Sequence, residues 1–283
     1  MSAPTDVWEL DYYSRPLLDE NGKKRWELLL SNGDGSFRWQ RFCAANSVNS
    51  VWLKEALGDA LAQAESDGAA APRRLRCWRT SMRTMVQRAA EQLGLEMVPS
   101  RRCYSLVEWL MQREAEVYPT MDGFMNGPLA PPPVPLQPLA IPLPEAVRGD
   151  SWGWANLPVA SLVDAGEWPM DFSGLVPLPD CDGKASVPGL RLFSSSRSLA
   201  LAGWLSGLEP VRLEVSGRQL VLEAGMEDRW LVSDLADDEA GSARQAFEQA
   251  RQEAGGLQFL AVQSTPESSE FAGFWLLRDL PDV

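Results

Sequence analysis

The chain opens on two runs of aromatic and aliphatic residues that are separated by a short polar segment. In the first run, residues 8–16, large apolar side chains alternate with Glu9 and Asp11. The second run, residues 26–30, is again rich in tryptophan and leucine. Because Asn21-Gly22 between them suits the positive backbone angles of a tight turn, the pattern predicts a β-hairpin. Alternation over 37–44 then predicts a third antiparallel strand.

The next part of the chain alternates between helical and strand patterns. Apolar residues recur at three- and four-residue steps in two stretches, the first of which ends at Gly68, and this spacing predicts two helices. The predicted elements are helices at 51–64 and 82–93 and strands at 75–80 and 95–98. Ser105-Leu106-Val107-Glu108 has the spacing of a capping box and predicts a third helix. The order βββαβαβα is that of ribonuclease H-like domains.

A proline-rich segment divides the chain. Eight prolines lie between 127 and 144, interleaved with aliphatic residues, and this density excludes a helix or a central strand. We therefore expect two α/β domains joined by a Pro-rich connector: an N-terminal domain at 1–126, the connector at 127–144 and an acidic C-terminal domain at 145–283. The stretch around Trp152, Trp154 and Trp168 has no clear periodicity.

Beyond residue 190 the periodicity becomes clear again and predicts a second set of strands and helices. The predicted strands are 190–193, 210–215, 219–223, 229–233, 257–263 and 271–278, and the predicted helices are 198–205 and 239–254. This mixture of strands and helices is typical of a second α/β unit.

Charge and composition exclude several classes of enzyme and metal-binding protein. The chain of 283 residues has a formal net charge of −13 and contains no histidine, which excludes Ser-His-Asp and Cys-His catalysis. Four scattered cysteines predict reduced thiols and no zinc site, and no phosphate-binding glycine loop is present. We expect no cofactor and no enzymatic activity. The sequence contains neither a signal segment nor a membrane span, which predicts a cytoplasmic protein.

The negative charge is uneven along the chain. Residues 145–283 contain 10 Lys and Arg against 22 Asp and Glu, whereas residues 73–113 contain nine arginines against three glutamates. Arginine binds phosphate bidentately, and aromatic side chains between arginines provide stacking surfaces for bases. The candidate RNA-binding residues are Arg73, Arg74, Arg76, Arg79, Arg83, Arg101, Arg102, Trp78 and Tyr104. The alternative is a solvated surface on which these arginines pair with nearby carboxylates.

The ribonuclease H-like order raises a metal-dependent nuclease as a further alternative. Asp11 stands on the first strand, and Glu55 and Asp59 lie on the first helix, but the fourth strand offers no acid. Because a two-metal site needs several convergent carboxylates, we expect neither a catalytic nor a metal-binding residue. Asp11 is instead expected to pair with Arg15 or a neighbouring basic side chain.

Both ends of the chain carry a family resemblance. The opening segment 8–16 and the closing segment 274–281 resemble the Tab2-like family of cyanobacterial and chloroplast factors, which are related to the translation factor for the PsaB mRNA of photosystem I. The two segments read Trp-Glu-Leu-Asp-Tyr-Tyr-Ser-Arg-Pro and Phe-Trp-Leu-Leu-Arg-Asp-Leu-Pro.

The resemblance implies an RNA-binding factor that promotes translation or accumulation of photosystem I proteins, and of photosystem II proteins as an extension, without a catalytic step. The expected partners are a single-stranded A/U-rich mRNA leader and photosystem assembly or translation proteins. The absence of a transit segment fits a cyanobacterial member. The alternative hypothesis is a protein-interaction scaffold for photosystem biogenesis that does not bind RNA directly.

Overall fold

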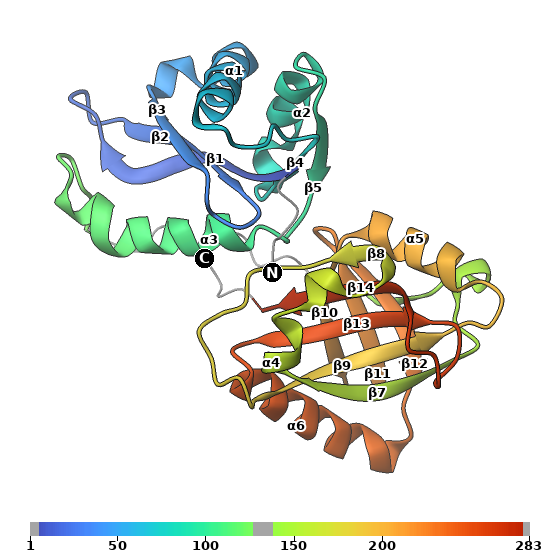
Figure 1. The fold of residues 1–283 in the computed structure, drawn as a ribbon. Helices are drawn as coiled ribbons and strands as arrows, with labels where there is room; N and C mark the ends of the chain where they lie inside the picture. The colour runs from blue at the N-terminus through green and yellow to red at the C-terminus, as the bar shows by residue number, and fades with distance from the viewer. Residues whose placement is uncertain (1–5, 127–137, 280–283) are drawn as a thin grey trace. The chain divides into compact units, whose positions relative to one another are not determined.

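The computed structural model describes residues 6–126 and 138–279 (Figure 1). The chain divides into two compact units, with 6–126 in the N-terminal unit and 138–279 in the C-terminal unit. Both units combine strands and helices, and three sheets are present in the described residues. The prediction of a mixed α/β protein is therefore confirmed.

The N-terminal unit contains one five-stranded sheet with the order β3-β2-β1-β4-β5. Strands β1, β2 and β3 form an antiparallel meander, and β4 and β5 are parallel to β1. The strands are β1 Val7–Leu18, β2 Lys24–Asn32, β3 Arg38–Cys43, β4 Arg74–Cys77 and β5 Glu96–Pro99. The opening hairpin is confirmed, and Gly22 takes the positive φ of 73° that its turn requires.

Helices cover both faces of this sheet (Figure 1). The face with Trp8, Leu10 and Tyr12 packs against α1 and α2 in one hydrophobic cluster. Because side chains alternate along a strand, Glu9 and Asp11 lie on the opposite face, under α3. The helices are α1 Ser50–Asp67, α2 Arg83–Glu91 and α3 Tyr104–Gln112, which continues as a π-helical turn at Arg113–Val117.

The C-terminal unit contains two sheets, with the orders β7-β9-β13-β14-β8 and β10-β11-β12-β6. One hydrophobic cluster joins side chains from both sheets and from helices α5 and α6. The strands are β6 Ile141–Pro142, β7 Ser151–Pro158, β8 Met170–Gly174, β9 Ser186–Phe193, β10 Pro210–Ser216, β11 Gln219–Ala224, β12 Asp228–Asp234, β13 Leu257–Gln263 and β14 Phe271–Arg278. The helices are α4 Val159–Leu162, α5 Ser198–Leu208 and α6 Asp237–Glu253.

The first part of the stretch without clear periodicity, residues 151–158, is the edge strand β7. Trp152 and Trp154 lie two residues apart on β7, and their rings meet edge to face at 5.4 Å between centroids. Both tryptophans pack against the cluster of the C-terminal unit. Within the predicted connector, residues 127–137 lie outside the described residues, while β6 pairs with Trp230 and Leu231 of β12.

The described residues contain no helix that is long and apolar enough to cross a membrane.

Candidate nucleic-acid interface

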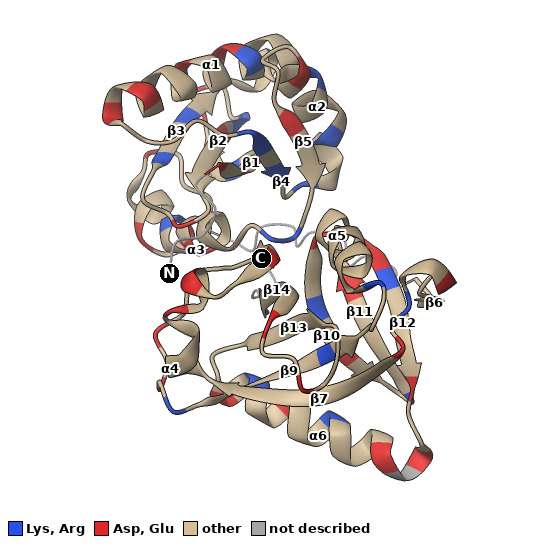
Figure 2. Cartoon of the chain, turned by 45° about the vertical axis from the view of Figure 1, so that its right-hand side comes forward, with Lys and Arg blue, Asp and Glu red and all other residues tan. Residues whose placement is uncertain are grey.

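The carboxyl ends of β4 and β5 lie at one edge of the N-terminal sheet. Cys77 and Pro99 are register partners, and the backbone N–H of Ser100 donates to the carbonyl of Cys77 at 3.3 Å. The segments that leave the two parallel strands are therefore adjacent. Trp78 and Arg79 follow β4, Arg101 and Arg102 follow β5, and α2 begins at Arg83. This group is called the β4–β5 edge below. Figure 2 shows Lys and Arg positions in blue on β4 and on α2.

The nine predicted RNA-binding residues differ in exposure. Arg73 and Arg83 are exposed, and Arg74, Trp78, Arg79 and Arg101 are partly exposed. By contrast, Arg76 is 8% exposed and Arg102 and Tyr104 are each 1% exposed. A base cannot stack on a ring that is covered by protein, nor can a buried guanidinium reach phosphate. The structure therefore places Arg76, Arg102 and Tyr104 in the interior, unlike the other six predicted residues.

The exposed arginines do not form one continuous face. Arg73 and Arg74 lie at the amino end of β4, and Arg79 follows its carboxyl end. At the rise of a β-strand, six residues separate Arg73 from Arg79 by about 20 Å. Arg74 also pairs with Glu96 on the neighbouring strand at 3.1 Å. The structure therefore brings Trp78, Arg79, Arg83 and Arg101 to one edge and leaves Arg73 and Arg74 at the other.

The interior arginines surround Glu9. This carboxylate is 1% exposed, and its Oε2 accepts the backbone N–H of Leu106 at 2.8 Å in the first turn of α3. Burial raises the pKa of Glu9 from its ordinary 4.5 to about 8, although the Leu106 N–H and the charges of Arg76 and Arg102 act in the opposite direction. Glu9 thus caps α3 from a strand 97 residues away in sequence.

Ser105 does not cap this helix, contrary to the capping-box prediction. The residue that precedes α3 is Cys103, whose side chain makes no capping bond. The hydroxyl of Ser105 donates instead to the carbonyl of Gly33 at 2.9 Å. The amino end of α3 is thereby tied to β1 and to the β2–β3 turn.

Asp11 is the second buried acid of β1. Its Oδ2 accepts from Arg15 at 2.8 Å, which confirms the predicted pairing, and its Oδ1 accepts from Arg79 at 2.8 Å. Burial raises the pKa of Asp11, but the two guanidinium groups lower it more, so that the net shift is downward. Arg79 also lies over the ring of Tyr13, 4.3 Å from its centroid. One face of the Arg79 guanidinium is therefore fixed by the protein.

Glu27 completes the buried ionic network. It accepts from Arg15 at 3.1 Å, from the Tyr118 hydroxyl at 2.6 Å and from Arg113 in the π-helical turn. Arg15 is 2% exposed and Glu27 is fully buried. The sequence contains a signal for this arrangement, because Glu9 and Asp11 alternate with Trp8, Leu10 and Tyr12. When a strand is covered on both faces, its acids require arginine partners.

The three acids named for the nuclease alternative lie on opposite faces of the N-terminal sheet. Tyr12 stacks on Trp52 of α1 with 5.4 Å between ring centroids, so α1 lies on the sheet face opposite Asp11. The carboxylates of Glu55 and Asp59 on α1 cannot converge with Asp11, and Asp59 pairs with Arg41. Among residues 6–126 and 138–279, no group of three or more Cys, Asp and Glu side chains is arranged to hold a metal ion.

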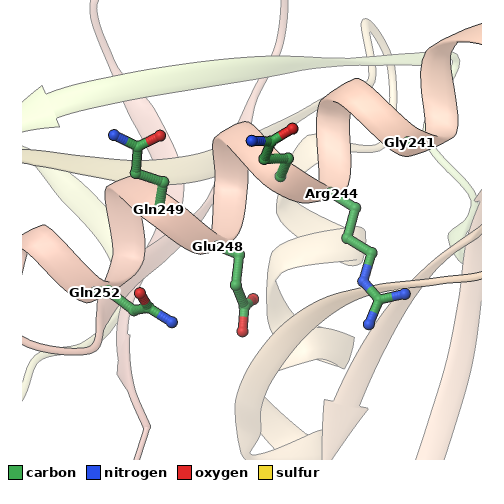
Figure 3. Close-up of a pocket in the computed structure, with 6 residues that line it drawn as sticks. Gly241, Arg244, Glu248, Gln249 and Gln252 are labelled. Carbon is green, nitrogen blue, oxygen red and sulfur yellow. The ribbon is translucent and has the colours of Figure 1, made fainter.

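In the C-terminal unit, a shallow groove runs along the solvent side of α6. Its lining residues Arg244, Glu248, Gln249 and Gln252 all belong to this one helix, and Figure 3 shows their side chains extending from it in different directions. Because no second element contributes a side chain, the groove does not converge on a ligand.

The geometry defines a class: a two-unit α/β protein whose N-terminal sheet carries an arginine-rich edge above a buried ionic network. Two family models of the RNA-binding protein Tab2/Atab2 match this chain. The model of the N-terminal region matches residues 7–113, and the model of the C-terminal domain matches residues 131–278. The chain therefore belongs to the Tab2/Atab2 family of RNA-binding proteins.

Two curated relatives have the same name, TAB2 homolog, chloroplastic. The Zea mays protein is 38% identical over 285 residues, which cover 97% of this chain and 72% of that protein. The Arabidopsis thaliana protein is 33% identical over 293 residues, which cover 97% and 75%. One chain of a solved complex of a simian T-cell lymphotropic virus intasome with PP2A regulatory subunit B56 gamma also matches. The match covers 54% of this chain and 62% of that chain, at 12% sequence identity and a TM-score of 0.31, and this likeness is too weak to carry an argument.

Proposed function

We propose that this protein binds single-stranded, A/U-rich mRNA leaders and promotes the translation or accumulation of photosystem I proteins, and of photosystem II proteins as an extension, without catalysing a reaction. Membership of an RNA-binding family supports an RNA partner. The names of the relatives in maize and Arabidopsis, which place them in the chloroplast, support a role in photosynthesis. A cytoplasmic location in a cyanobacterium stays a prediction.

The observation that carries this proposal is the β4–β5 edge. Arg83 is exposed, with no ion pair to an acid among the described residues, and Arg101 and Trp78 are partly exposed beside it. Arg79 is fixed between Asp11 and the ring of Tyr13, so little side-chain entropy is lost when it contacts phosphate. Arg73 and Arg74 stay as predicted contacts at the other end of β4.

The interior residues support this edge instead of touching RNA. The charges of Arg76 and Arg102 act on Glu9, which caps α3, and lower its pKa against the effect of burial. Arg102 also lies 5.7 Å from the ring centroid of Tyr104. We infer that the ribonuclease H-like order of elements serves here as a rigid platform. On it, arginines occupy the surroundings of Asp11, where a nuclease would require further acids.

The experiment is a comparison of RNA affinity between matched arginine variants. In the full chain, Arg83→Gln with Arg101→Gln should weaken binding of a single-stranded A/U-rich RNA by about 1–3 kcal/mol, because two phosphate contacts are lost. Arg88→Gln is the control, since Arg88 is also exposed but lies at the opposite end of α2. Equal affinities for the double variant and the control would show that RNA does not bind at the β4–β5 edge.

A protein-interaction scaffold remains the second candidate, supported by the charge of the C-terminal half. Residues 145–283 contain 10 basic against 22 acidic residues, which repels RNA and suits a basic protein partner. The two candidates differ in one outcome. If the protein is a scaffold, a pull-down from a lysate still recovers its protein partners after ribonuclease treatment. If it associates with them through RNA, ribonuclease treatment removes them.

A further inference from the structure

The edge strand β3 carries a second group of arginines and aromatic rings, far from the β4–β5 edge in the strand order. Arg38, Gln40 and Phe42 alternate along β3 and pair with Ser31, Leu29 and Glu27 of β2. They therefore share the sheet face on which α3 lies. Arg38 and Gln40 are exposed and Phe42 is half-buried, so α3 leaves this part of the face open to solvent.

The rings on this face are in contact with arginines. The Arg25 guanidinium lies over Phe42 at 4.1 Å from the ring centroid. Arg38 and Arg113 each lie 5.5 Å from the ring of Trp109, which comes from α3 and is half-buried. We name the group Arg25, Arg38, Phe42 and Trp109 the β3 face.

The surroundings of the β3 face are basic. Lys23 and Lys24 are exposed and directly precede Arg25, and Arg38 is exposed at the other end of β3. None of these four cations has an ion pair with an acid in the part of the chain that the structure describes. By contrast, Arg41 points to the other face of the same strand and pairs with Asp59. The open face thus has cations without acidic partners, a charge that is complementary to a phosphate backbone.

We propose that the β3 face is a stacking site for bases of single-stranded RNA, and this inference rests on the proposed RNA-binding function. Exposed aromatic side chains on a sheet surface, flanked by basic groups, bind single strands by stacking bases and contacting phosphates. A base takes the place of Arg38 over Trp109, and the released guanidinium pairs with the adjacent phosphate. Phe42 stacks a second base in the same way beside Arg25.

The test uses the full chain and a fluorescein-labelled oligouridylate, with affinity measured by fluorescence anisotropy. Phe42→Leu keeps an apolar side chain but removes the ring, and it should weaken binding about tenfold. Phe42→Tyr keeps the ring and should bind like the wild type. Arg38→Gln should flatten the dependence of log affinity on log salt concentration by about 0.7, the value for one phosphate contact on a single strand. Arg41→Gln, the control on the opposite face, should leave this salt dependence unchanged.

A second measurement does not depend on variants. Oligouridylate that contains 5-iodouridine should crosslink under ultraviolet light to the peptides with Phe42 or Trp109. The proposal for the β3 face would be overturned by crosslinks confined to other peptides. It would also be overturned if the Phe42→Leu and Arg38→Gln variants fold and bind like the wild type. If the wild type binds no oligouridylate and no A/U-rich RNA, the proposed function fails together with this inference. If only the Arg83 and Arg101 variants weaken binding, the proposed function stands and the β3 face fails.

Discussion

At the scale of single residues, the acids of the first two strands are structural. Glu9, Asp11 and Glu27 are buried. Asp11 and Glu27 accept from Arg15, and Glu9 accepts a helix N–H from Leu106. A buried ion pair adds little net stability when it forms, but the loss of one partner leaves an uncompensated buried charge. The arginines of this protein therefore fall into two populations, one that supports the fold and one that faces solvent.

The loss of stability on substitution should differ between a buried arginine, Arg15, and a partly exposed one, Arg41. The substitution Arg15→Met leaves Asp11 and Glu27 without a shared cation, and it should lower the free energy of unfolding by about 3–5 kcal/mol. Arg41→Met removes an exposed pair with Asp59 and should cost no more than about 1 kcal/mol. Urea denaturation monitored by circular dichroism measures both. Equal destabilisation by the two substitutions would show that the buried network has no special role.

Glu9 should make stability depend on pH. Its pKa is raised from 4.5 to about 8 in the folded protein, so the folded state binds more protons than the unfolded state between these values. Stability from the protonated carboxyl is fully present below pH 4.5 and is lost as pH rises through about 8. Glu9→Gln removes the titration and keeps an acceptor for Leu106.

The measurement is the free energy of unfolding of wild type minus that of Glu9→Gln, followed from pH 5 to pH 9. The difference should fall with rising pH, and the variant should become the relatively more stable protein at the alkaline end. A difference that stays constant, or that rises with pH, would mean that Glu9 is ionised in the fold throughout.

At the scale of elements, local signals predicted most of the helices and strands, because apolar periodicity and turn residues are read within a few positions. The Asn21-Gly22 hairpin, the end of α1 at Gly68 and the strands after Leu190 are examples. The pattern does not predict strand β7, because Gly153 and Ala155 alternate with its tryptophans and Asn156 has the same parity as the tryptophans, so that apolar and polar residues do not alternate.

The buried site could not be predicted in the same way, because its contacts are long-range. Arg79 and Asp11 are 68 residues apart, and Leu106 and Glu9 are 97 apart. The sequence indicated an arginine-rich region and a partner for Asp11, but not which arginines turn inward. Burial of Arg76, Arg102 and Tyr104 is decided by how α3 crosses the sheet, which no local pattern reports.

The connection between the end of β1 and the segment after α3 gives an element-scale prediction. Gly123 has a φ of 80°, and a Cβ there would lie 2.2 Å from the carbonyl oxygen of Leu18. Gly123→Ala should therefore destabilise the protein more than Gly22→Ala, which has a similar φ but nothing within 4 Å and should cost about 1–2 kcal/mol. Thermal unfolding of both variants is the measurement. Similar melting temperatures would mean that this loop moves away without cost.

At the scale of the whole molecule, charge is divided between the two halves of the chain. The N-terminal unit carries the exposed arginines of the β4–β5 edge and the β3 face, whereas the C-terminal half carries most of the excess acid. A net charge of −13 opposes RNA binding at long range, so specific phosphate contacts must overcome it. Strong salt dependence is the signature of such contacts.

The most direct test of RNA binding through these arginines is therefore a salt series on the full chain. Affinity for a single-stranded A/U-rich RNA should fall steeply as salt rises, and about four phosphate contacts would give a log–log slope of about −3. The Arg83→Gln and Arg101→Gln double variant should have a slope that is shallower by about 1.4. A flat salt dependence, or no binding by the wild type at low salt, would contradict this account.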